Sequence, residues 1–269
     1  MPFKDLIKQL TPPILFNMGR NKTQYGWFGD YSSWAEMQKE CGGYDAANIL
    51  EKCKGALLKV KNGEAVYERD SVLFDKIEYS WPVLAGFLKC ALENEGRLHV
   101  MDFGGSLGSS YYQNRGLLSG LKEFSWSIVE QKHFVDCGKE SFEDGILKFY
   151  ETKDLCLKQR TPNVLLLSGV IQYLEYPYEW IKKFCSLGVE YIIVDLVGLI
   201  DSKDRITVQK VPPEIYQASY PCWLLNKQRV IDAFSEKYVC LSQFDAFIGN
   251  ELLVDGKKFS YGGFILKRK

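Results

Sequence analysis

Apolar and polar positions alternate in blocks along the second half of the chain. Five short, mostly apolar runs have the length of strands, at 98–103, 125–129, 147–150, 164–167 and 191–197. Segments with apolar residues at helical spacing lie between them, at 110–121, 134–142 and 178–186. Strands that alternate with helices predict βαβ units around a parallel sheet, with right-handed crossovers.

The pattern changes after Gly198. Residues 199–226 hold three prolines among several aromatic residues and are too long for a simple βα turn, so we expect an elaborated loop. A helix capped by Asn226 follows, and two further strands at 238–247 and 259–266 are joined without a helix, so they must pair antiparallel. The expected fold is α/β: a doubly wound sheet of seven strands, mostly parallel with an antiparallel last strand.

The first part of the chain lacks this alternation and predicts helices. Residues 1–24 suggest a short helix, a Pro-Pro break and a polar loop. Ser32 or Ser33 is a plausible N-cap, with Glu36 three residues beyond Ser33 as a capping-box partner. Residues 67–94 are interpreted as helical, with Pro82 as a kink or restart.

We therefore expect two regions. Residues 1–95 form an N-terminal helical extension, and residues 96–269 form one α/β domain with 199–226 as an insertion. Aromatic residues near the start of the extension either pack in the core or form a lid over a site: Tyr25, Trp27, Phe28, Tyr31 and Trp34.

Composition narrows the function classes. The 269 residues include 34 basic and 34 acidic residues, so no basic surface for nucleic acid is expected. Two histidines and eight scattered cysteines without CxxC pairs argue against a metal site and for reduced thiols in a cytoplasmic protein. No apolar run reaches the ~20 residues that span a bilayer, and the start lacks the order of a signal peptide, so stable membrane insertion is not expected.

The stretch RLHVMDFGGSLGSSYY, residues 97–112, organises the chain. It contains a strand that ends near Asp102, a glycine-rich turn and residues that can begin a helix. Glycines let a ligand approach the backbone, and a helix N-terminus offers free N–H groups to an anionic or polar group. An acid beside them suits a ligand that also carries positive charge. A nucleotide-like ligand is the first hypothesis, and a tight βα turn in an ordinary α/β domain is the alternative.

Other candidate residues follow the later strands. Glu130 ends the second strand, where an acid in nucleotide-binding folds accepts from ribose hydroxyls; the alternative is a surface glutamate. Asp154 follows the third strand and could accept from an adenine amine; the alternative is a helix-capping or loop aspartate. Ser168 and Gly169 close the fourth strand, so they and the residues after them, Tyr173 included, should face the ligand.

These residues resemble a known family. The motif DFGGSLG, the acid Glu130 and the segments KDLCL and SGVIQYL are similar, in order and spacing, to those of class I S-adenosylmethionine-dependent methyltransferases. The resemblance implies their Rossmann-like fold, closed by an antiparallel hairpin. More narrowly, DFGGSLGSSYY, GWFGDYSSW and TVQKVPPEIYQASYPCW resemble an uncharacterised group of bacterial methyltransferases associated with surface-polysaccharide gene clusters. The chain departs from the common E/DxGxGxG motif, because Gly105 stands at the variable position and Ser106 replaces the second glycine.

The resemblance implies S-adenosylmethionine as the cofactor. The residues it assigns are Asp102, Gly104, Gly105, Ser106 and Gly108 for the methionine part, Glu130 for the ribose, Asp154 for the adenine edge, and Ser168 and Gly169 beside them.

An acceptor hydroxyl also needs a base. His133 and Asp195 are the candidates; the alternatives are a surface or packing histidine and an aspartate that only caps a turn. Aromatic side chains with polar tips suit stacking on sugar faces, and the alternative is that they only pack together. The candidate substrate-binding residues are Trp27, Tyr31, Tyr173, Tyr216, Tyr220 and Trp223.

The leading hypothesis is methyl transfer from S-adenosylmethionine to an oxygen of a small-molecule or carbohydrate acceptor. One alternative is a non-catalytic module that binds the cofactor or its product, S-adenosylhomocysteine. Another is a nicotinamide-dependent oxidoreductase, against which the closing antiparallel strand argues.

Overall fold

The computed structural model describes residues 25–41, 47–213, 215–216, 218–248 and 252–269. The short helix and proline break expected over 1–24 lie outside the described residues. Within the described part, no helix is both long and apolar enough to cross a membrane.

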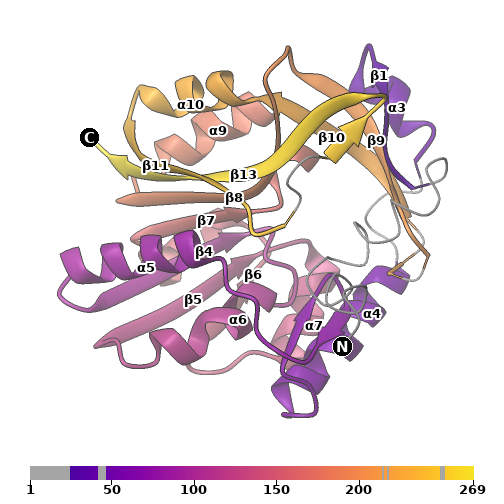
Figure 1. Ribbon diagram of the computed structural model, residues 1–269. Helices are drawn as coiled ribbons and strands as arrows, with labels where there is room; N and C mark the ends of the chain where they lie inside the picture. Colours follow the sequence, from indigo (N-terminus) through magenta and orange to yellow (C-terminus); the bar gives the residue numbers. More distant parts are fainter. Residues whose placement is uncertain (1–24, 42–46, 214, 217, 249–251) are drawn as a thin grey trace, which may run out of the picture.

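Helices and strands alternate from α5 to β8, and the described segments before and after this part do not follow that alternation (Figure 1). The helices are α3 (Trp34–Gln38), α4 (Ala47–Lys61), α5 (Trp81–Glu93), α6 (Ser109–Leu118), α7 (Lys132–Ser141), α8 (Lys153–Gln159), the 3₁₀ helix η1 (Ile171–Tyr173), α9 (Pro177–Ser186) and α10 (Lys227–Ser235). The strands are β1 (Gly26–Tyr31), β2 (Tyr67–Arg69), β3 (Val72–Phe74), β4 (Arg97–Phe103), β5 (Glu123–Val129), β6 (Leu147–Tyr150), β7 (Val164–Ser168), β8 (Tyr191–Ile200), β9 (Arg205–Val211), β10 (Ala218–Asn226), β11 (Tyr238–Asp245), β12 (Leu252–Val254) and β13 (Lys257–Arg268). The prediction of a mixed α/β fold is confirmed.

The α/β part has a sheet with the strand order β6-β5-β4-β7-β8-β13-β11. Strands β4 to β8 are parallel, and β13 pairs antiparallel with both β8 and β11. The chain moves from β4 toward one edge and from β7 toward the other. These two strands therefore flank the point where the strand order reverses.

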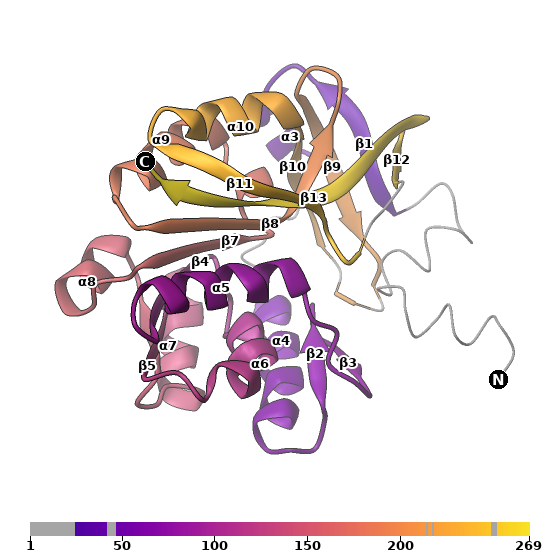
Figure 2. The ribbon, with the colours of Figure 1, turned by 60° about the vertical axis from the view of Figure 1, so that its left-hand side comes forward.

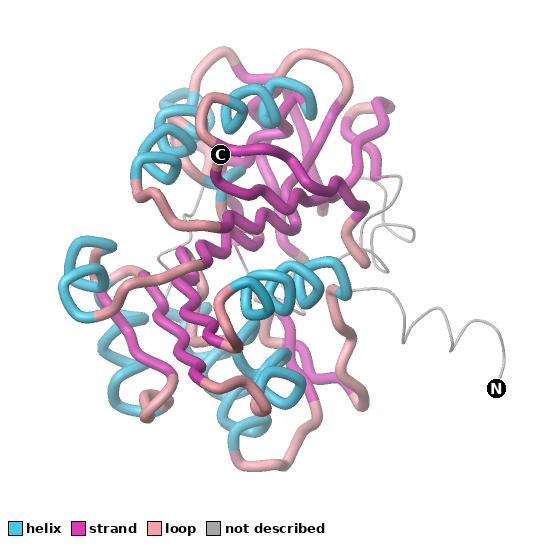
Figure 3. The backbone as a smooth tube through the Cα atoms, turned by 90° about the vertical axis from the view of Figure 1, so that its left-hand side faces the viewer, coloured by secondary structure: helices cyan, strands magenta, loops and turns pink. Residues whose placement is uncertain are grey.

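Helices cover both faces of this sheet (Figures 2 and 3). Alternate residues along a strand point to opposite faces. Val100 and Leu166 pack with residues of α5, α6 and α7 on one face. Met101 and Leu165 pack with residues of α8, α9 and α10 on the other. Since both faces are covered, the strands have the continuous apolar sequences seen in the chain.

Two predicted helix caps are confirmed. The Ser33 hydroxyl accepts the backbone N–H of Glu36 at 3.2 Å, while the Glu36 carboxylate accepts the N–H of Ser32 at 3.2 Å. The Asn226 side-chain oxygen accepts the N–H of Arg229 at 2.9 Å. The Ser33 and Asn226 oxygens each satisfy a backbone donor that the first helical turn leaves without a partner, whereas the Glu36 carboxylate satisfies the donor of the residue before the cap.

The prediction of a loop over 199–226 is wrong, because strands occupy most of this segment. β8 continues to Ile200, and β9 and β10 form an antiparallel pair. The β9 sequence RITVQKV is rich in β-branched residues, and all of it except Lys210 is buried. Pro212 and Pro213, which suggested a loop, lie in the connection between the two strands.

The predicted N-terminal extension is not wholly helical. Strand β1 occupies 26–31, the hairpin β2–β3 occupies 67–74, and Pro82 lies in the first turn of α5. The aromatic residues of β1 suit a pleated, half-buried surface. Asp70 and Ser71 have φ values of +50° and +65°, and they join β2 to β3 as a two-residue turn.

Strands from both ends of the described chain close a ring. The described strands β8, β10, β9, β1, β12 and β13 pair in succession, and β13 pairs with β8 again. A hydrophobic cluster joins them through residues such as Trp27, Leu224, Val254 and Phe259. β1 is therefore part of the main sheet, which has eleven strands among the described residues and not the predicted seven, because β10, β9, β1 and β12 join it.

Candidate functional site

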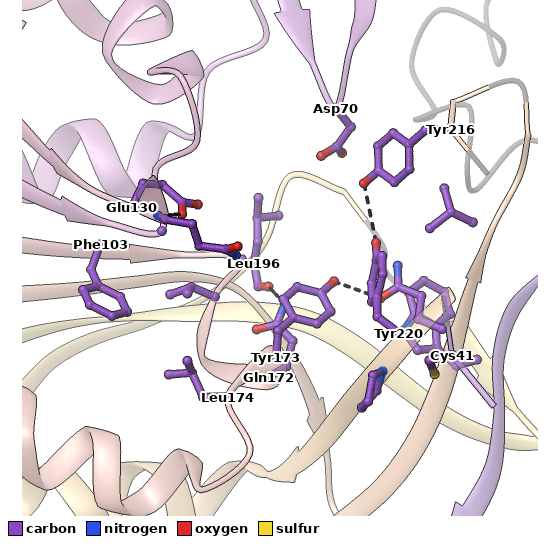
Figure 4. Close-up of a pocket in the computed structure, with 18 of the residues that line it drawn as sticks. Cys41, Asp70, Phe103, Glu130, Gln172, Tyr173, Leu174, Leu196, Tyr216 and Tyr220 are labelled. Atoms are coloured by element: carbon purple, nitrogen blue, oxygen red, sulfur yellow. Dashed lines mark hydrogen bonds between the residues drawn. The ribbon is translucent and has the colours of Figure 1, made fainter. Parts of the chain in front are cut away.

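A cavity of about 600 Å³ lies at the carboxyl ends of the parallel strands (Figure 4). Gly104 follows β4, Glu130 and Glu151 follow β5 and β6, and Gly169 follows β7. Leu196 of β8 also lines the cavity. This edge, where the strand order reverses between β4 and β7, is where open α/β sheets bind ligands.

The opposite wall comes from segments outside the α/β alternation. Trp27, Gln209 and Tyr220 come from the ring of strands, Tyr173 comes from η1, and Asp70 comes from the β2–β3 hairpin. The wall also includes Trp34, Gln38, Cys41, Val211, Ile215, Tyr216, Pro221, Ile248 and Tyr261. The cavity thus lies between the strand ends on one side and the N-terminal and 199–226 segments on the other.

The glycine-rich turn after β4 is tightly packed. Gly104 has a φ of +75° and donates its N–H to the Val129 carbonyl at 2.9 Å. A Cβ on Gly104 would lie 2.6 Å from Cγ2 of Val170, so glycine fits there without strain and other residues do not. The N–H of Gly108 donates to the Gly105 carbonyl at 3.0 Å, and α6 begins at the next residue.

Asp102 is buried beneath this turn. Its side chain accepts the indole N–H of Trp126 at 3.0 Å, and the residue is 1% exposed. A Cβ on Gly105 would lie 2.5 Å from the Asp102 carboxyl carbon, so the turn packs directly against the acid. Burial raises the pKa of Asp102 to about 7, although the hydrogen bond from Trp126 opposes this shift. Asp102 supports the turn and is not among the described residues that line the cavity.

Glu130 is half-buried and its carboxylate lies at the cavity (Figure 4). The carboxylate accepts the backbone N–H of Gln131. Burial is the largest influence on this carboxyl and raises its pKa, whereas the backbone groups of Gln131 and Ser106 and the nearby His133 lower it. Ser106 has a φ of +52°, a conformation that brings the glycine-rich turn close to the end of β5.

Asp70 reaches the cavity from the tip of the β2–β3 hairpin. Asp70 and Ser71 both adopt the left-handed backbone that non-glycine residues rarely occupy, as a type I′ turn requires. The Ser71 N–H donates to the Glu68 carboxylate at 3.2 Å and helps to hold the turn. Asp70 is in contact with solvent, yet the protein atoms around its carboxyl raise its pKa, and the neighbouring Arg69 opposes this shift.

Tyrosine side chains surround the same end of the cavity. The Tyr173 hydroxyl donates to Oε1 of Gln209 at 2.8 Å, and the hydroxyls of Tyr216 and Tyr220 are 3.5 Å apart. The rings of Tyr173 and Tyr220 meet edge to face with centroids 5.2 Å apart. Burial raises the pKa of Tyr173, Tyr220 and Tyr261 above the ordinary value for tyrosine. These hydroxyls are therefore protonated at neutral pH and can donate hydrogen bonds.

Gln172 lines the cavity beside Tyr173 (Figure 4). It is 1% exposed, and its amide Nε2 donates to the Leu196 carbonyl at 2.9 Å. Its Oε1 is buried and has no hydrogen-bond donor among the described residues. A buried acceptor without a donor costs free energy, so this oxygen is an unusual feature of the site.

The ionisable part of the lining is acidic. Asp70, Glu130 and Glu151 line the cavity, and the described lining residues include no lysine, arginine or histidine. Carboxylates attract a positively charged ligand and repel phosphate groups, most strongly where water is partly excluded. The charge of the lining therefore favours a ligand with a cationic group.

Asp154 lies away from the cavity lining. It is in the first turn of α8, where its exposed carboxylate pairs with Lys153 at 2.7 Å. Thr152 caps that helix, through a hydrogen bond from the Leu155 N–H. Glu151, the first residue after β6, reaches the cavity instead.

The two candidate bases are also absent from the described lining. His133 lies on α7, half-buried against the ring of Phe134. Asp195 lies within β8 and is 4% exposed. Burial raises the pKa of Asp195 to about 7, and the Ser80 hydroxyl and the Leu196 backbone oppose the shift.

The remaining predicted residues divide between the cavity and its surroundings. Trp27, Tyr173, Tyr216 and Tyr220 line the cavity with Gly104, Glu130 and Gly169. Outside the described lining, Tyr31 donates to the Glu40 carboxylate at 3.1 Å, and Trp223 stacks on Trp34 with centroids 6.1 Å apart. Ser168 pairs with Asp195 in the sheet, while Gly105, Ser106 and Gly108 belong to the turn beside the cavity.

Five polar or charged residues of the lining were not predicted: Gln38, Asp70, Gln131, Glu151 and Gln209. Gln172 belongs to the segment after β7 that was predicted to face the ligand. Glu151 had a local signal, because it is the first acid after a correctly predicted strand. Asp70 and Gln209 reach the cavity through hairpin and ring pairings between distant segments.

No family model matches the chain, and no curated protein matches it. Among solved structures, the chain is similar to the N-terminal domain of EvdMO1 in the presence of SAH and D-fucose, with a TM-score of 0.47 and 10% identity over 83% of this chain and 99% of that one. It is also similar to the glycopeptide N-methyltransferase MtfA complexed with sinefungin, with a TM-score of 0.45 and 10% identity over 69% and 94% of the chains. A third similar structure is an S-adenosylmethionine-dependent methyltransferase from Clostridium acetobutylicum ATCC 824, with a TM-score of 0.43 and 8% identity over 68% and 89%. These similarities concern the fold.

Proposed function

We propose that this protein is an enzyme that transfers a methyl group from S-adenosylmethionine to a hydroxyl group of a small-molecule or saccharide acceptor. The observation that carries the proposal is the acidic cavity at the strand-order reversal, lined by Glu130 and Glu151 and by no described basic side chain. S-adenosylmethionine carries a sulfonium and an ammonium group, which such a lining attracts.

The residues at the strand ends fit this cofactor. Glu130, after β5, would accept from the ribose hydroxyls, and Glu151 would take the adenine-side role that the resemblance assigned to Asp154. The Gly104–Gly108 turn and the start of α6 would hold the methionine carboxylate through backbone N–H groups. When bound, the cofactor supplies a methyl group on a positively charged sulfur, which keeps the electron pair of the broken carbon–sulfur bond.

The same lining supports a methyltransferase over a nicotinamide-dependent oxidoreductase. A nicotinamide dinucleotide carries two phosphates, and Asp70, Glu130 and Glu151 would repel them with no described basic side chain to compensate. The position of β13, antiparallel between β8 and β11, agrees with the sheet that the resemblance implies.

The tyrosine-lined end of the cavity is our candidate acceptor site. Tyr173, Tyr216 and Tyr220 present rings and hydroxyls, a combination that suits a sugar or a phenol. Asp70 is the carboxylate at this end, and we assign it the role of base in place of His133 or Asp195. It would take the acceptor's hydroxyl proton as the oxygen forms its bond to the methyl carbon.

All eight cysteines are free, which supports action in a reducing compartment such as the cytoplasm.

Calorimetry on the full-length protein tests the cofactor. S-adenosylhomocysteine and S-adenosylmethionine should bind, and NADH should not. Binding of NADH without S-adenosylhomocysteine would overturn the proposal in favour of an oxidoreductase. Transfer of labelled methyl to monosaccharides and catechols, measured next, separates an enzyme from a non-catalytic binding module.

A further inference from the structure

The buried Gln172 amide has a fixed orientation. Nε2 donates to the Leu196 carbonyl at 2.9 Å, and a flipped amide would place two acceptors against each other. This contact therefore sets Oε1 as the atom without a donor among the described residues. An unused acceptor on a Gln side chain that lines a cavity can receive a hydrogen bond from a bound ligand.

The Leu196 carbonyl is held by an irregularity in β8. Phe264 of β13 pairs with Val194, and Gly262 pairs with Val197, so Asp195 and Leu196 together oppose one residue of β13. This is a β-bulge, a feature that often lies beside functional sites and redirects a residue.

Leu196 also has a φ of +52°, which is a rare conformation for a leucine. A residue in this region stores strain that the rest of the fold must offset, and such strain is concentrated at functional sites. Here the strained residue provides the carbonyl that orients Gln172. The bulge at Leu196 thus determines the orientation of the Gln172 amide at the cavity wall.

We propose that the Leu196 bulge positions Gln172 so that its Oε1 accepts a hydrogen bond from the ammonium group of the methionine part of the cofactor. This inference rests on the proposed function. The donor must be an N–H or O–H group, which excludes the sulfonium itself. Glu130 and Glu151 stand at β5 and β6 for the ribose and adenine, whereas Gln172 follows β7, on the other side of the strand-order reversal. With the ribose and adenine assigned to the ends of β5 and β6, the ammonium is the donor group of the cofactor that remains for the end of β7. The carboxylate-rich lining favours its positive charge.

The test compares two ligands that share an adenosine and a thioether. S-adenosylhomocysteine carries the amino acid end, and 5′-methylthioadenosine lacks it. Gln172→Met removes the acceptor with little change of shape. It should weaken the binding of S-adenosylhomocysteine by about 10- to 100-fold, the range for hydrogen bonds to charged groups. It should weaken the binding of 5′-methylthioadenosine by less than about threefold.

Gln209→Met is the matched control. Gln209 is also buried and lines the cavity, but its Oε1 already accepts from the Tyr173 hydroxyl. Its replacement should leave the ratio of the two affinities unchanged. Gln172→Asn withdraws the amide by one methylene and serves as a second variant if Gln172→Met does not fold. It should likewise weaken the binding of S-adenosylhomocysteine more than the binding of 5′-methylthioadenosine.

The outcomes separate the two proposals. If the wild-type protein does not bind S-adenosylhomocysteine, the proposed function fails and this inference fails with it. If the wild type binds, but the Gln172 variants weaken both ligands equally or neither, the ammonium assignment is overturned while the proposed function stands. A selective loss of S-adenosylhomocysteine affinity in the Gln172 variants alone supports the inference.

Discussion

Replacing Asp102 with asparagine should make the stability of the protein less dependent on pH. Asp102 is 1% exposed beneath the glycine-rich turn, and burial raises its pKa from 3.8 to about 7. An unfolded chain titrates this carboxyl near 4. Between about pH 4 and 7 the folded protein therefore keeps a proton that the unfolded chain has released. Stability must fall as the pH rises through this window.

The size of the effect follows from the separation of the two pKa values. A difference of about three units, at 1.36 kcal/mol per unit, amounts to on the order of 4 kcal/mol lost between pH 4 and pH 8. Asparagine does not titrate, and its side-chain oxygen can still accept the Trp126 N–H. Asp195, whose pKa is also raised to about 7, and Glu68 give the variant a remaining slope of the same sign. The difference between wild type and variant isolates Asp102.

Urea unfolding at half-unit steps from pH 5 to pH 8, followed by tryptophan fluorescence, measures this difference. The free energy of unfolding of the variant minus that of the wild type should increase by roughly 1.4 kcal/mol per pH unit up to pH 7, and this difference should then stay constant. A difference that stays constant from pH 5 to pH 7, or one that decreases as the pH rises, would refute a buried carboxyl with a raised pKa.

Further changes test individual residues of the cavity. Glu130→Gln should weaken S-adenosylhomocysteine by about 1.5–3 kcal/mol in calorimetry, because it removes a charged acceptor; an unchanged affinity in a folded variant removes Glu130 from the site. Asp70→Asn should slow methyl transfer by about 10²–10⁴-fold while leaving S-adenosylhomocysteine affinity within about twofold. Asp75→Asn, which removes an exposed acid nearby, should leave both the rate and the affinity unchanged. Gly104→Ala should lower the free energy of unfolding by about 1–3 kcal/mol, because its Cβ would collide with Val170. Adding Val170→Ala should restore part of this loss, and no recovery would mean that the backbone conformation, not the collision, sets the cost.

The parallel strands could be predicted because their signal is local. β6 has the predicted bounds, 147–150, and β7 extends the predicted 164–167 by one residue, since runs buried on both faces must be apolar. Residues at the ends of such strands are then placed at one edge of the sheet by the parallel topology. Gly104, Glu130 and Gly169 lie around the cavity for this reason.

The rest of the site depends on pairings that no short stretch of sequence encodes. β1 and β9 are strands largely because they pair with each other and with other strands of the ring. The turn at Asp70 and Ser71 lacks the glycine that usually indicates a hairpin. Gln172 becomes unusual only through its contact with Leu196, whose own conformation depends on the bulge opposite β13.

The ring of strands has a consequence for the order in which the chain can fold during its synthesis. β4, β5, β6 and β7 pair with one another and all lie between residues 97 and 168, so their part of the sheet can form while the ribosome is still at work. β1 leaves the ribosome before these strands, yet its partners are β9 and then β12, which are made after them. Until β12 emerges, β1 cannot complete its pairing, and the edge strands of the unfinished ring can pair with other chains. A newly made molecule therefore completes the glycine-turn wall of the cavity first and the tyrosine-lined wall last.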